Sequence, residues 1–225
     1  MSGDLQAVGL TALLAATTTL LLVPLASPLA WWLARSTSPS RSLIEAVVAM
    51  PLVLPPTVLG FYLLVMLNPE SAVGSLWVEL TGDSLTFSFS GLVIASIIYS
   101  LPFMVQPLQA AFRAVPEPVL EAAATLGAAP RDRWLNVVLP MAKRGYLTGC
   151  VLTFAHTVGE FGVVLMMGGN IPGETRVLSI AIYEHVETLN YDAAHMLALG
   201  LLCFSFLSLW LVYRYAGHRF EVVRG

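Results

Sequence analysis

The sequence predicts an all-α protein, a polytopic bundle of about five transmembrane helices that forms a single domain over residues 1–225. The first reason is composition: 57% of the residues are hydrophobic and only 11% are charged, whereas a soluble domain carries about 25% charged residues. The second is that long apolar stretches recur along the chain. The third is the one-sided placement of basic residues between these stretches.

Five stretches have the roughly 20 apolar residues that cross the hydrocarbon core of a bilayer. They cover residues 6–33, 45–67, 87–112, 146–167 and 193–215. The first is long enough to tilt strongly or to extend beyond the bilayer. A further apolar stretch, residues 177–183, is too short to span, so we expect it to re-enter the membrane or to lie at its outer surface.

The basic residues predict how the chain is oriented. Of the 11 Lys and Arg residues, Arg176 is the only one on one side of the predicted spans. The other ten lie on the opposite side: Arg35, Arg41, Arg113, Arg131, Arg133, Lys143, Arg144, Arg214, Arg219 and Arg224. Cytoplasmic loops are enriched in Lys and Arg. We therefore expect the N-terminus outside, and residues 114–145 and the C-terminus in the cytoplasm.

Prolines interrupt the predicted spans, most densely at MPLVLPP, residues 50–56. Each proline removes a backbone donor and opens a helical turn. In lipid, the freed carbonyl groups need a partner from protein or water. Two interpretations remain open: a broken helix beside a translocation path, or a structural kink between packed helices.

A polar segment, EAAATLGAAPRDRWLNVVLP at residues 121–140, stands out in so apolar a chain. Pro116 suits the first turn of a helix. Gly127 permits a left-handed helix end, and Pro130 can start a second helix. Pro140 should kink or end that second helix before the fourth span. By composition alone, the segment would be an ordinary cytoplasmic helical hairpin.

The spacing within this segment resembles the EAA loop of bacterial ABC importer permeases. The match comprises Glu121-Ala122-Ala123, then Gly127, and, after nine intervening residues, Val137 with Leu139-Pro140. The resemblance implies a type I (MetI-like) permease fold in a bacterial cytoplasmic (inner) membrane. It also implies that residues 114–145, which we call the docking loop, fit a cleft in a separate ATP-hydrolysing subunit.

The resemblance assigns ATPase coupling to eight residues: Glu121, Ala122, Ala123, Leu126, Gly127, Arg131, Leu139 and Pro140. Leu126, Trp134 and Leu139 offer apolar anchors for a partner. Arg131 can pair with a carboxylate of the partner or with lipid headgroups.

Two other segments resemble the molybdate branch of these permeases. They are GEFG with GNIPGETR, residues 159–162 and 169–176, and MPLVLPPTVLGFYLL, residues 50–64. The sulfate branch is similar and shares the Gly-Asn-Ile-Pro element. The resemblance implies import of molybdate, with tungstate or sulfate and thiosulfate as alternatives. It further implies a homodimer, two ATP-binding subunits and a periplasmic or extracellular oxyanion-binding protein.

Glu160 lies within the fourth predicted span, where a carboxylate is costly and suggests a functional role. It either lines a water-filled path or gate, or makes a structural hydrogen bond. His156, one helical turn earlier, either pairs with Glu160 or packs as a neutral side chain. The candidate path or gate residues are Glu160, Asn170, Glu174, Thr175 and Arg176. Arg176 either meets a passing anion or forms a salt bridge with Glu174 or Glu160.

Catalytic and cofactor motifs are absent from the sequence. Its single lysine, Lys143, lies in MAKRG and not in a P-loop. We therefore expect no enzymatic activity, cofactor or metal in this chain, with ATP and Mg²⁺ held by the partner ATPase. There is no basic stripe for nucleic acid, so membrane lipid is the surrounding partner. The alternative class is an ion-coupled secondary transporter or channel, which would need its own ion site and usually an inverted repeat.

Overall fold

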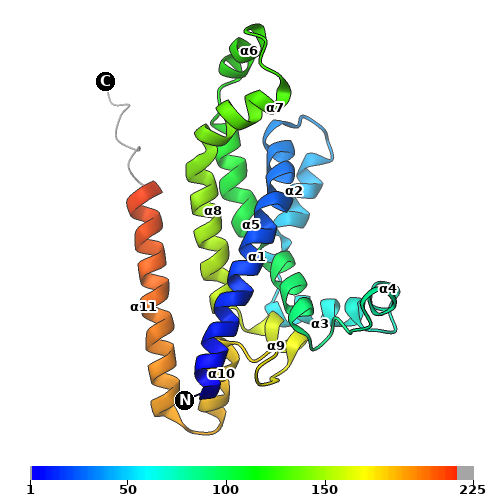
Figure 1. Cartoon of the computed structure of the whole chain (residues 1–225), viewed down its shortest axis with the longest axis vertical. Coiled ribbons are helices and arrows are strands. Elements are labelled where there is room, and N and C mark those ends of the chain that lie inside the picture. Colours follow the sequence, from blue (N-terminus) through cyan, green and yellow to red (C-terminus); the bar gives the residue numbers. More distant parts are fainter. Residues whose placement is uncertain (1, 217–225) are drawn as a thin grey trace.

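The structure, a computed structural model, describes residues 2–216, and these residues fold into an all-α assembly. Three long helices pack along one another: α1 (Ser2–Arg35), α5 (Phe89–Arg113) and α8 (Leu139–Gly159). A fourth, α11 (Tyr191–Ala216), runs beside α8 (Figure 1). The all-α bundle predicted from the sequence is confirmed.

The number of candidate spans agrees with the sequence, but two of them are broken. Helices α1, α5 and α11 are each long and apolar enough to cross a membrane. Two bent pairs raise the number to as many as five. In one pair, α2 (Arg41–Ala49) and the 3₁₀ turn η1 (Met50–Leu52) meet α3 (Pro56–Leu67) at 108°. In the other, α8 meets α9 (Gly162–Gly168) at 62°.

Backbone chemistry explains the first break. Pro55 has an extended backbone (φ −55°, ψ 132°), and Pro56 opens α3. Neither residue has an N–H group to bond to the preceding turn, so the helix stops and restarts in a new direction. The second predicted span is therefore a bent pair of helices, and the proline-rich segment marks a broken helix.

Two short helices form the end of the molecule that carries the docking loop: α6 (Glu117–Thr125) and α7 (Pro130–Arg133). A π-helical turn, η2 (Trp134–Val138), then leads directly into α8. The helix continues from Pro130 to Gly159, so the expectation that Pro140 ends it is wrong, while a kink at Pro140 stays a prediction. A π-turn bonds each N–H group five residues back, which leaves room for the Pro140 ring and for its missing donor.

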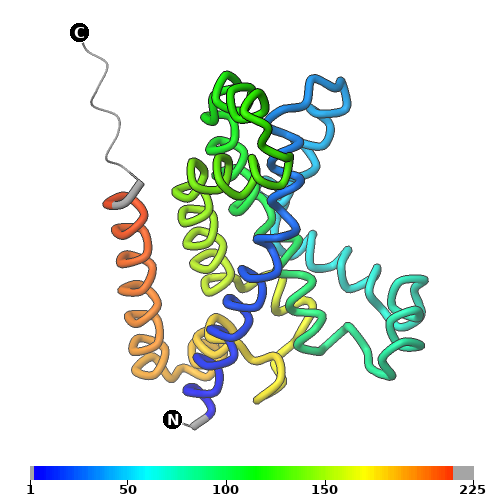
Figure 2. Tube along the Cα trace, turned by 45° about the horizontal axis from the view of Figure 1, so that its top comes forward, coloured from blue at the N-terminus to red at the C-terminus, as the bar shows by residue number. Residues whose placement is uncertain are grey.

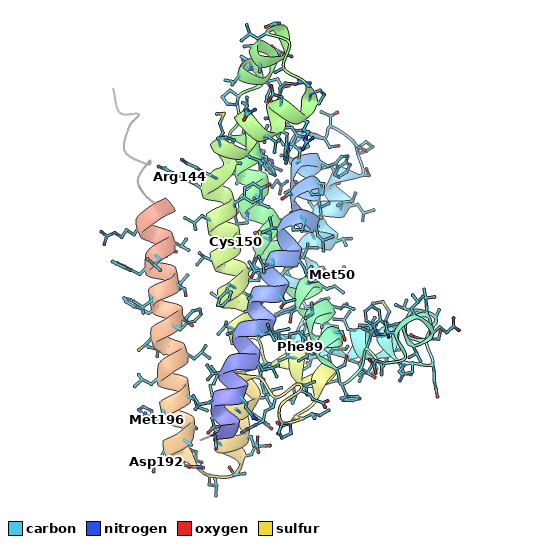
Figure 3. The ribbon with its side chains drawn as sticks, in the orientation of Figure 1. Met50, Phe89, Arg144, Cys150, Asp192 and Met196 are labelled. Carbon is cyan, nitrogen blue, oxygen red and sulfur yellow. The ribbon has the colours of Figure 1, made fainter. Side chains whose placement is uncertain are left out.

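The opposite end of the molecule is formed by the start of α1, by α10 (Leu178–Glu187) and by the start of α11. Helix α4 (Ala72–Thr81) extends to one side (Figure 1). Arg144 lies toward the docking loop and Asp192 at the far end (Figure 3). The tube in Figure 2 likewise separates the N-terminus from α6 and α7. The predicted basic residues Arg219 and Arg224 lie outside the described range.

Close helix contacts depend on small residues. On α8, a Cβ atom at Gly145 would lie 2.4 Å from the Cβ of Ala111 on α5, and one at Gly149 would lie 2.8 Å from the sulfur of Met104. Both glycines are buried. Small residues at such contacts let transmembrane helices approach closely, and van der Waals packing then holds them together. The α5–α8 pair is therefore a closely packed support for the loop between them.

Candidate functional site

The docking loop turns at Gly127, as predicted from the sequence. Gly127 has a left-handed backbone, with φ of +85°. Its N–H group donates to the carbonyl of Ala124, and the N–H group of Ala128 donates to that of Ala123, each at 3.0 Å. These two bonds form a Schellman end to α6. The prediction of a left-handed helix end is confirmed.

Most of the residues predicted to contact an ATPase are exposed on this loop. The side chain of Leu126 at its tip is 87% exposed. Glu121, Ala122, Gly127, Arg131 and Pro140 are also exposed, while Ala123 and Leu139 are half-buried. The loop therefore presents an apolar tip flanked by a carboxylate and a guanidinium group.

Trp134, expected as an apolar anchor for a partner, is half-buried against the bundle, and its contact with a partner stays a prediction. Its ring centroid lies 5.1 Å from that of Trp31 on α1 and 5.5 Å from that of Phe112 on α5. This aromatic cluster attaches the base of the docking loop to the bundle. Trp134 thus contributes to packing between the docking loop, α1 and α5.

Arg35, at the end of α1, holds the start of the docking loop. Its Nη2 donates to the carbonyl oxygens of Phe112, at 3.2 Å, and Val115, at 2.7 Å. Its Nη1 pairs with Glu117 in the first turn of α6. The guanidinium also lies 5.0 Å from the ring centroid of Trp31. The sequence suggested only that Arg35 orients the chain, because its partners are distant along the sequence.

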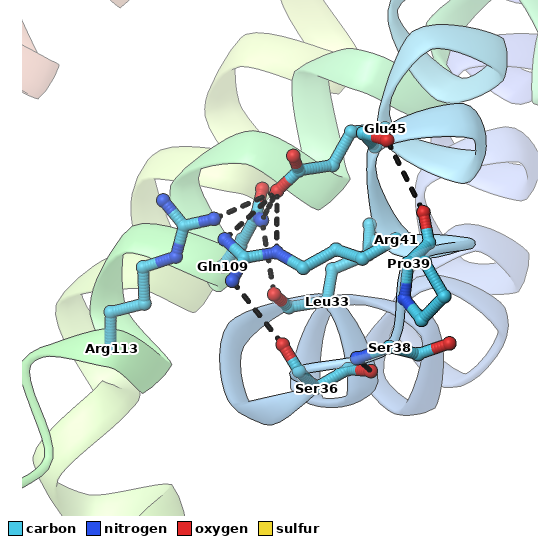
Figure 4. Close-up of polar contacts among 9 residues, drawn as sticks. Leu33, Ser36, Ser38, Pro39, Arg41, Glu45, Gln109 and Arg113 are labelled. Carbon is cyan, nitrogen blue, oxygen red and sulfur yellow. Dashed lines mark hydrogen bonds and ion pairs between the residues drawn. The ribbon is translucent and has the colours of Figure 1, made fainter.

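A second polar cluster joins α2 to α5 just before the loop (Figure 4). One carboxylate oxygen, Oε1 of Glu45, accepts from Gln109 Nε2 at 2.6 Å and from Arg113 Nη2 at 2.8 Å. The same oxygen accepts from Arg41 Nε and Nη2, each at 3.2 Å. We call these four residues the Glu45 cluster. Reasoning from the sequence did not identify it.

A pocket of about 530 Å³ opens where the two bent spans meet. Its lining comes from the start of α3, the middle of α5, the end of α8 and the start of α9: Pro56, Thr57, Tyr99, Ala155, His156, Gly159, Glu160, Phe161 and Gly162. The sequence indicated each break separately. It did not indicate that the breaks face each other, because helix pairing depends on the whole bundle.

Glu160 is the one predicted path residue that lines this pocket. It is 6% exposed, and its Oε1 accepts from the backbone N–H group of Val163 at 2.8 Å. The carboxylate therefore makes a structural hydrogen bond to the first turn of α9 and also faces the pocket. A functional role for Glu160 stays a prediction.

His156 packs on α5 and does not pair with Glu160. Its Nδ1 is hydrogen-bonded to the hydroxyl of Ser100 at 3.0 Å, and its ring stacks on Phe103 with centroids 3.9 Å apart. The interpretation of His156 as a packed side chain is confirmed. The alternative, an ion pair with Glu160, is wrong, because Ser100 and Phe103 hold the imidazole against α5.

The remaining predicted path residues lie in the loop between α9 and α10. Thr175 is fully buried: its hydroxyl donates to the carbonyl of Gly168 at 2.6 Å and accepts from the N–H group of Ile171 at 3.2 Å. Asn170 and Glu174 are exposed. Thr175 therefore holds the loop in its shape.

Arg176 bridges the loop to two helices. Its Nε lies 2.8 Å from Glu184 Oε2 on α10, and its Nη2 lies 3.4 Å from Asp4 Oδ1 on α1. The expected salt bridge to Glu174 or Glu160 is wrong, because the side chain points toward the start of α1. Among the described residues, no group of three His, Cys, Asp or Glu side chains is placed to hold a metal ion.

Comparison with known proteins gives consistent matches in sequence. A family model described as "Binding-protein-dependent transport system inner membrane component" matches residues 26–218. The chain is 55% identical over 210 residues to the molybdenum transport system permease protein ModB of Azotobacter vinelandii, covering 93% of each chain. It is 36% identical over 183 residues to ModB of Escherichia coli K12, covering 81% of this chain and 80% of the relative. A probable sulfate transport system permease, cysT of Marchantia polymorpha, is 30% identical over 92% of this chain and 72% of the relative.

Solved structures share the fold. A bacterial ABC transporter that imports alginate matches with a TM-score of 0.72 and 18% identity, covering 95% of this chain and 80% of the other. The MetNI methionine ABC transporter, in an inward-facing conformation, matches with a TM-score of 0.65 and 17% identity, covering 95% and 93%. These likenesses confirm the MetI-like fold. The chain belongs to the family of binding-protein-dependent transport system inner membrane components.

Proposed function

We propose that this chain is the permease subunit of an ABC importer that moves molybdate into the cytoplasm. One observation carries the proposal: the 55% identity, over 93% of each chain, to a protein named as a molybdenum transport permease. Relatives with the same name in Escherichia coli and Mycobacterium tuberculosis are 36% and 39% identical.

In this proposal a partner subunit hydrolyses ATP. The docking loop contacts that partner and transmits its movement to the membrane helices. ATP and Mg²⁺ bind two partner ATPases, and two copies of this chain form the membrane pore. The exposed tip at Leu126, with Glu121 and Arg131 beside it, has the apolar and charged groups that a protein interface uses. The Schellman turn at Gly127 gives this tip one defined conformation.

The pocket between the bent spans lies on the translocation path in this proposal. Its lining is mostly apolar, with few donors to hold a dianion. Glu160 would repel such an ion if charged. A transport path must bind its substrate weakly enough to release it. Selection among anions would then fall to a separate oxyanion-binding protein outside the membrane.

The proposed orientation places the docking loop and the C-terminus in the cytoplasm and the N-terminus outside. The support is the separation of the ends: Arg35 and Arg113 lie beside the docking loop, and Arg176 lies at the far end. An excess of basic residues marks the cytoplasmic side of a membrane protein.

Reconstitution tests the proposed function. The chain would be purified with its ATPase, placed in liposomes with the binding protein, and supplied with radioactive molybdate. We expect uptake that requires ATP and the binding protein. Uptake that persists without ATP would support a secondary transporter or channel and overturn the proposal.

Sulfate is the second candidate substrate, because the Marchantia relative named as a sulfate permease is 30% identical. A competition assay distinguishes the two candidate substrates. Unlabelled molybdate or tungstate should suppress the uptake of radioactive molybdate at concentrations at which sulfate does not. Suppression by sulfate at lower concentrations than those needed of molybdate would favour sulfate transport.

A further inference from the structure

We infer that Glu45 is a positioning residue that transmits movement of the docking loop to the broken second span. The inference rests on the proposed function, because it concerns how ATP hydrolysis on a partner reaches the pocket. It assigns a role to the Glu45 cluster, which joins α2 to α5 at the base of the docking loop (Figure 4).

The Glu45 cluster lies at the end of α5, next to the start of the docking loop, so a movement of the loop would displace it. Arg113 is the last residue of α5, and α6 begins at Glu117. Arg113 Nη2 and Gln109 Nε2 both donate to Glu45 Oε1 on α2, at 2.8 and 2.6 Å. Gln109 also donates to the carbonyl of Leu33, at 3.4 Å, near the end of α1. A displacement of the end of α5 therefore acts directly on α2.

Apolar packing of α2 against the bundle is limited to Val48 and Ile44, and the Glu45 cluster is its polar contact with α5. The helix has one buried residue, Val48, whereas Leu43 is 68% exposed and Val47 is 53% exposed. A hollow of about 360 Å³, lined by the cluster together with Leu33, Val48, Ala49 and Gln106, adjoins the contact with α5. This hollow gives α2 room to change position without compressing a packed protein core.

The far end of α2 leads to the pocket. The chain passes through η1, bends by 108° and starts α3 at Pro56. Pro56 and Thr57 line the pocket, and Pro56 touches Gly162 on α9. A shift of α2 therefore changes the spacing between the two broken spans at the site that the substrate would pass.

The cluster has the exposure expected of a contact that breaks and re-forms. The side chains of Glu45 and Arg113 are 36% and 46% exposed. Ion pairs with this much solvent access add little to stability. Removing the Glu45 carboxylate should therefore leave the protein folded and change how its parts move together.

The test measures molybdate uptake and ATP hydrolysis together in liposomes that contain the permease, its ATPase and the binding protein. Glu45→Gln removes the charge and keeps the shape. We expect the ATP consumed per molybdate to rise about fivefold or more, the lower range of typical couplings between sites. Glu79→Gln, which neutralises an exposed acid on α4, is the matched control and should leave the ratio unchanged.

A conservative substitution distinguishes coupling from a general defect. Glu45→Asp keeps a carboxylate for Arg41, Gln109 and Arg113, and it should keep most of the ratio that Glu45→Gln loses. If Glu45→Gln fails to assemble with the ATPase, Arg113→Gln removes one of the same contacts from the other side. A wild-type ratio in the tested single variant, or equal ratios for Glu45→Asp and Glu45→Gln, overturns the inference. Absence of uptake by the wild-type complex would instead contradict the proposed function.

Discussion

Pro56 and Gly162 touch across the breaks of two different spans: a Cβ atom on Gly162 would lie 2.6 Å from the Cβ of Pro56. The relationship recurs one turn along, where a Cβ on Gly60 would lie 2.8 Å from the Cβ of Met166. The absent side chains let α3 and α9 pack closely at the edge of the pocket. The two broken helices thus support each other.

A methyl group at this contact should disturb both helices. In Gly162→Ala, the new Cβ meets a ring atom of Pro56, which cannot rotate away. Overpacking of this kind costs about 1–3 kcal/mol. We expect a lower Tm of the purified protein in detergent and weaker uptake in liposomes.

The control for that substitution is Gly9→Ala in α1, where nothing lies within 4 Å of the added Cβ. It should leave the Tm unchanged or slightly raised, because alanine favours helix. Equal Tm values for the two variants would show that the close approach of α3 and α9 has no energetic importance.

The left-handed turn at Gly127 provides a second test. Its φ of +85° is strained for any residue with a Cβ, at about 1–2 kcal/mol. Gly127→Val should therefore distort the end of α6 and weaken coupling to the ATPase, while the chain still inserts into the membrane. The measurement is uptake per ATP hydrolysed, with membrane insertion checked by fractionation.

Gly82 offers a matched control for backbone strain. It also has positive φ, +81°, with nothing within 4 Å of an added Cβ, and it follows α4, apart from α6 (Figure 1). Gly82→Val should introduce similar backbone strain and leave the uptake per ATP hydrolysed unchanged. If uptake per ATP fell in both variants, backbone strain anywhere in the chain, and not the turn at Gly127, would weaken coupling.

Leu126 should contribute directly to ATPase affinity. Its side chain is 87% exposed at the tip of the docking loop, and burying a leucine side chain is worth about 1.5–3 kcal/mol. Leu126→Ala should weaken ATPase binding about tenfold without lowering the Tm of the isolated permease. Binding can be measured by titrating purified ATPase onto the permease in nanodiscs.

Leu80→Ala is the control, since Leu80 is 75% exposed on α4. It should bind the ATPase as the unmodified protein does. If Leu126→Ala bound the ATPase as tightly as the unmodified protein, the docking surface would lie elsewhere on the loop.

Local chemistry made part of this structure predictable from sequence. The positive φ of Gly127 and the helix start at Pro130 each follow from the conformations available to one residue. The break at residues 50–56 follows from missing N–H groups. Such features need no knowledge of distant parts of the chain. The sequence therefore predicted the turn at Gly127 and the helix start at Pro130, and for residues 50–56 it offered the break as one of two interpretations.

Features that join distant segments were not predictable in this way. Arg176 and Asp4 are separated by 172 positions, and Glu45 and Arg113 by 68. The packing of Trp134 on Trp31 and Phe112 was likewise not predicted, because the three rings come from distant parts of the chain. The pocket was missed for the same reason, since it exists only once α3 and α9 are packed together.

The buried hydroxyl of Thr175 supplies hydrogen-bond partners to two backbone groups in the loop between α9 and α10. It connects the carbonyl of Gly168 with the N–H group of Ile171. Thr175→Val keeps the shape and leaves both groups without the hydroxyl, which costs about 1–3 kcal/mol for a buried polar group. We expect a lower Tm and faster hydrogen exchange at the Ile171 amide. Thr175→Ser keeps the hydroxyl and should show slow exchange, with only the smaller loss from a missing methyl group. If valine and serine gave the same exchange rate, the hydroxyl would not hold the loop, and its shape would instead depend on the Arg176 contacts with Asp4 and Glu184.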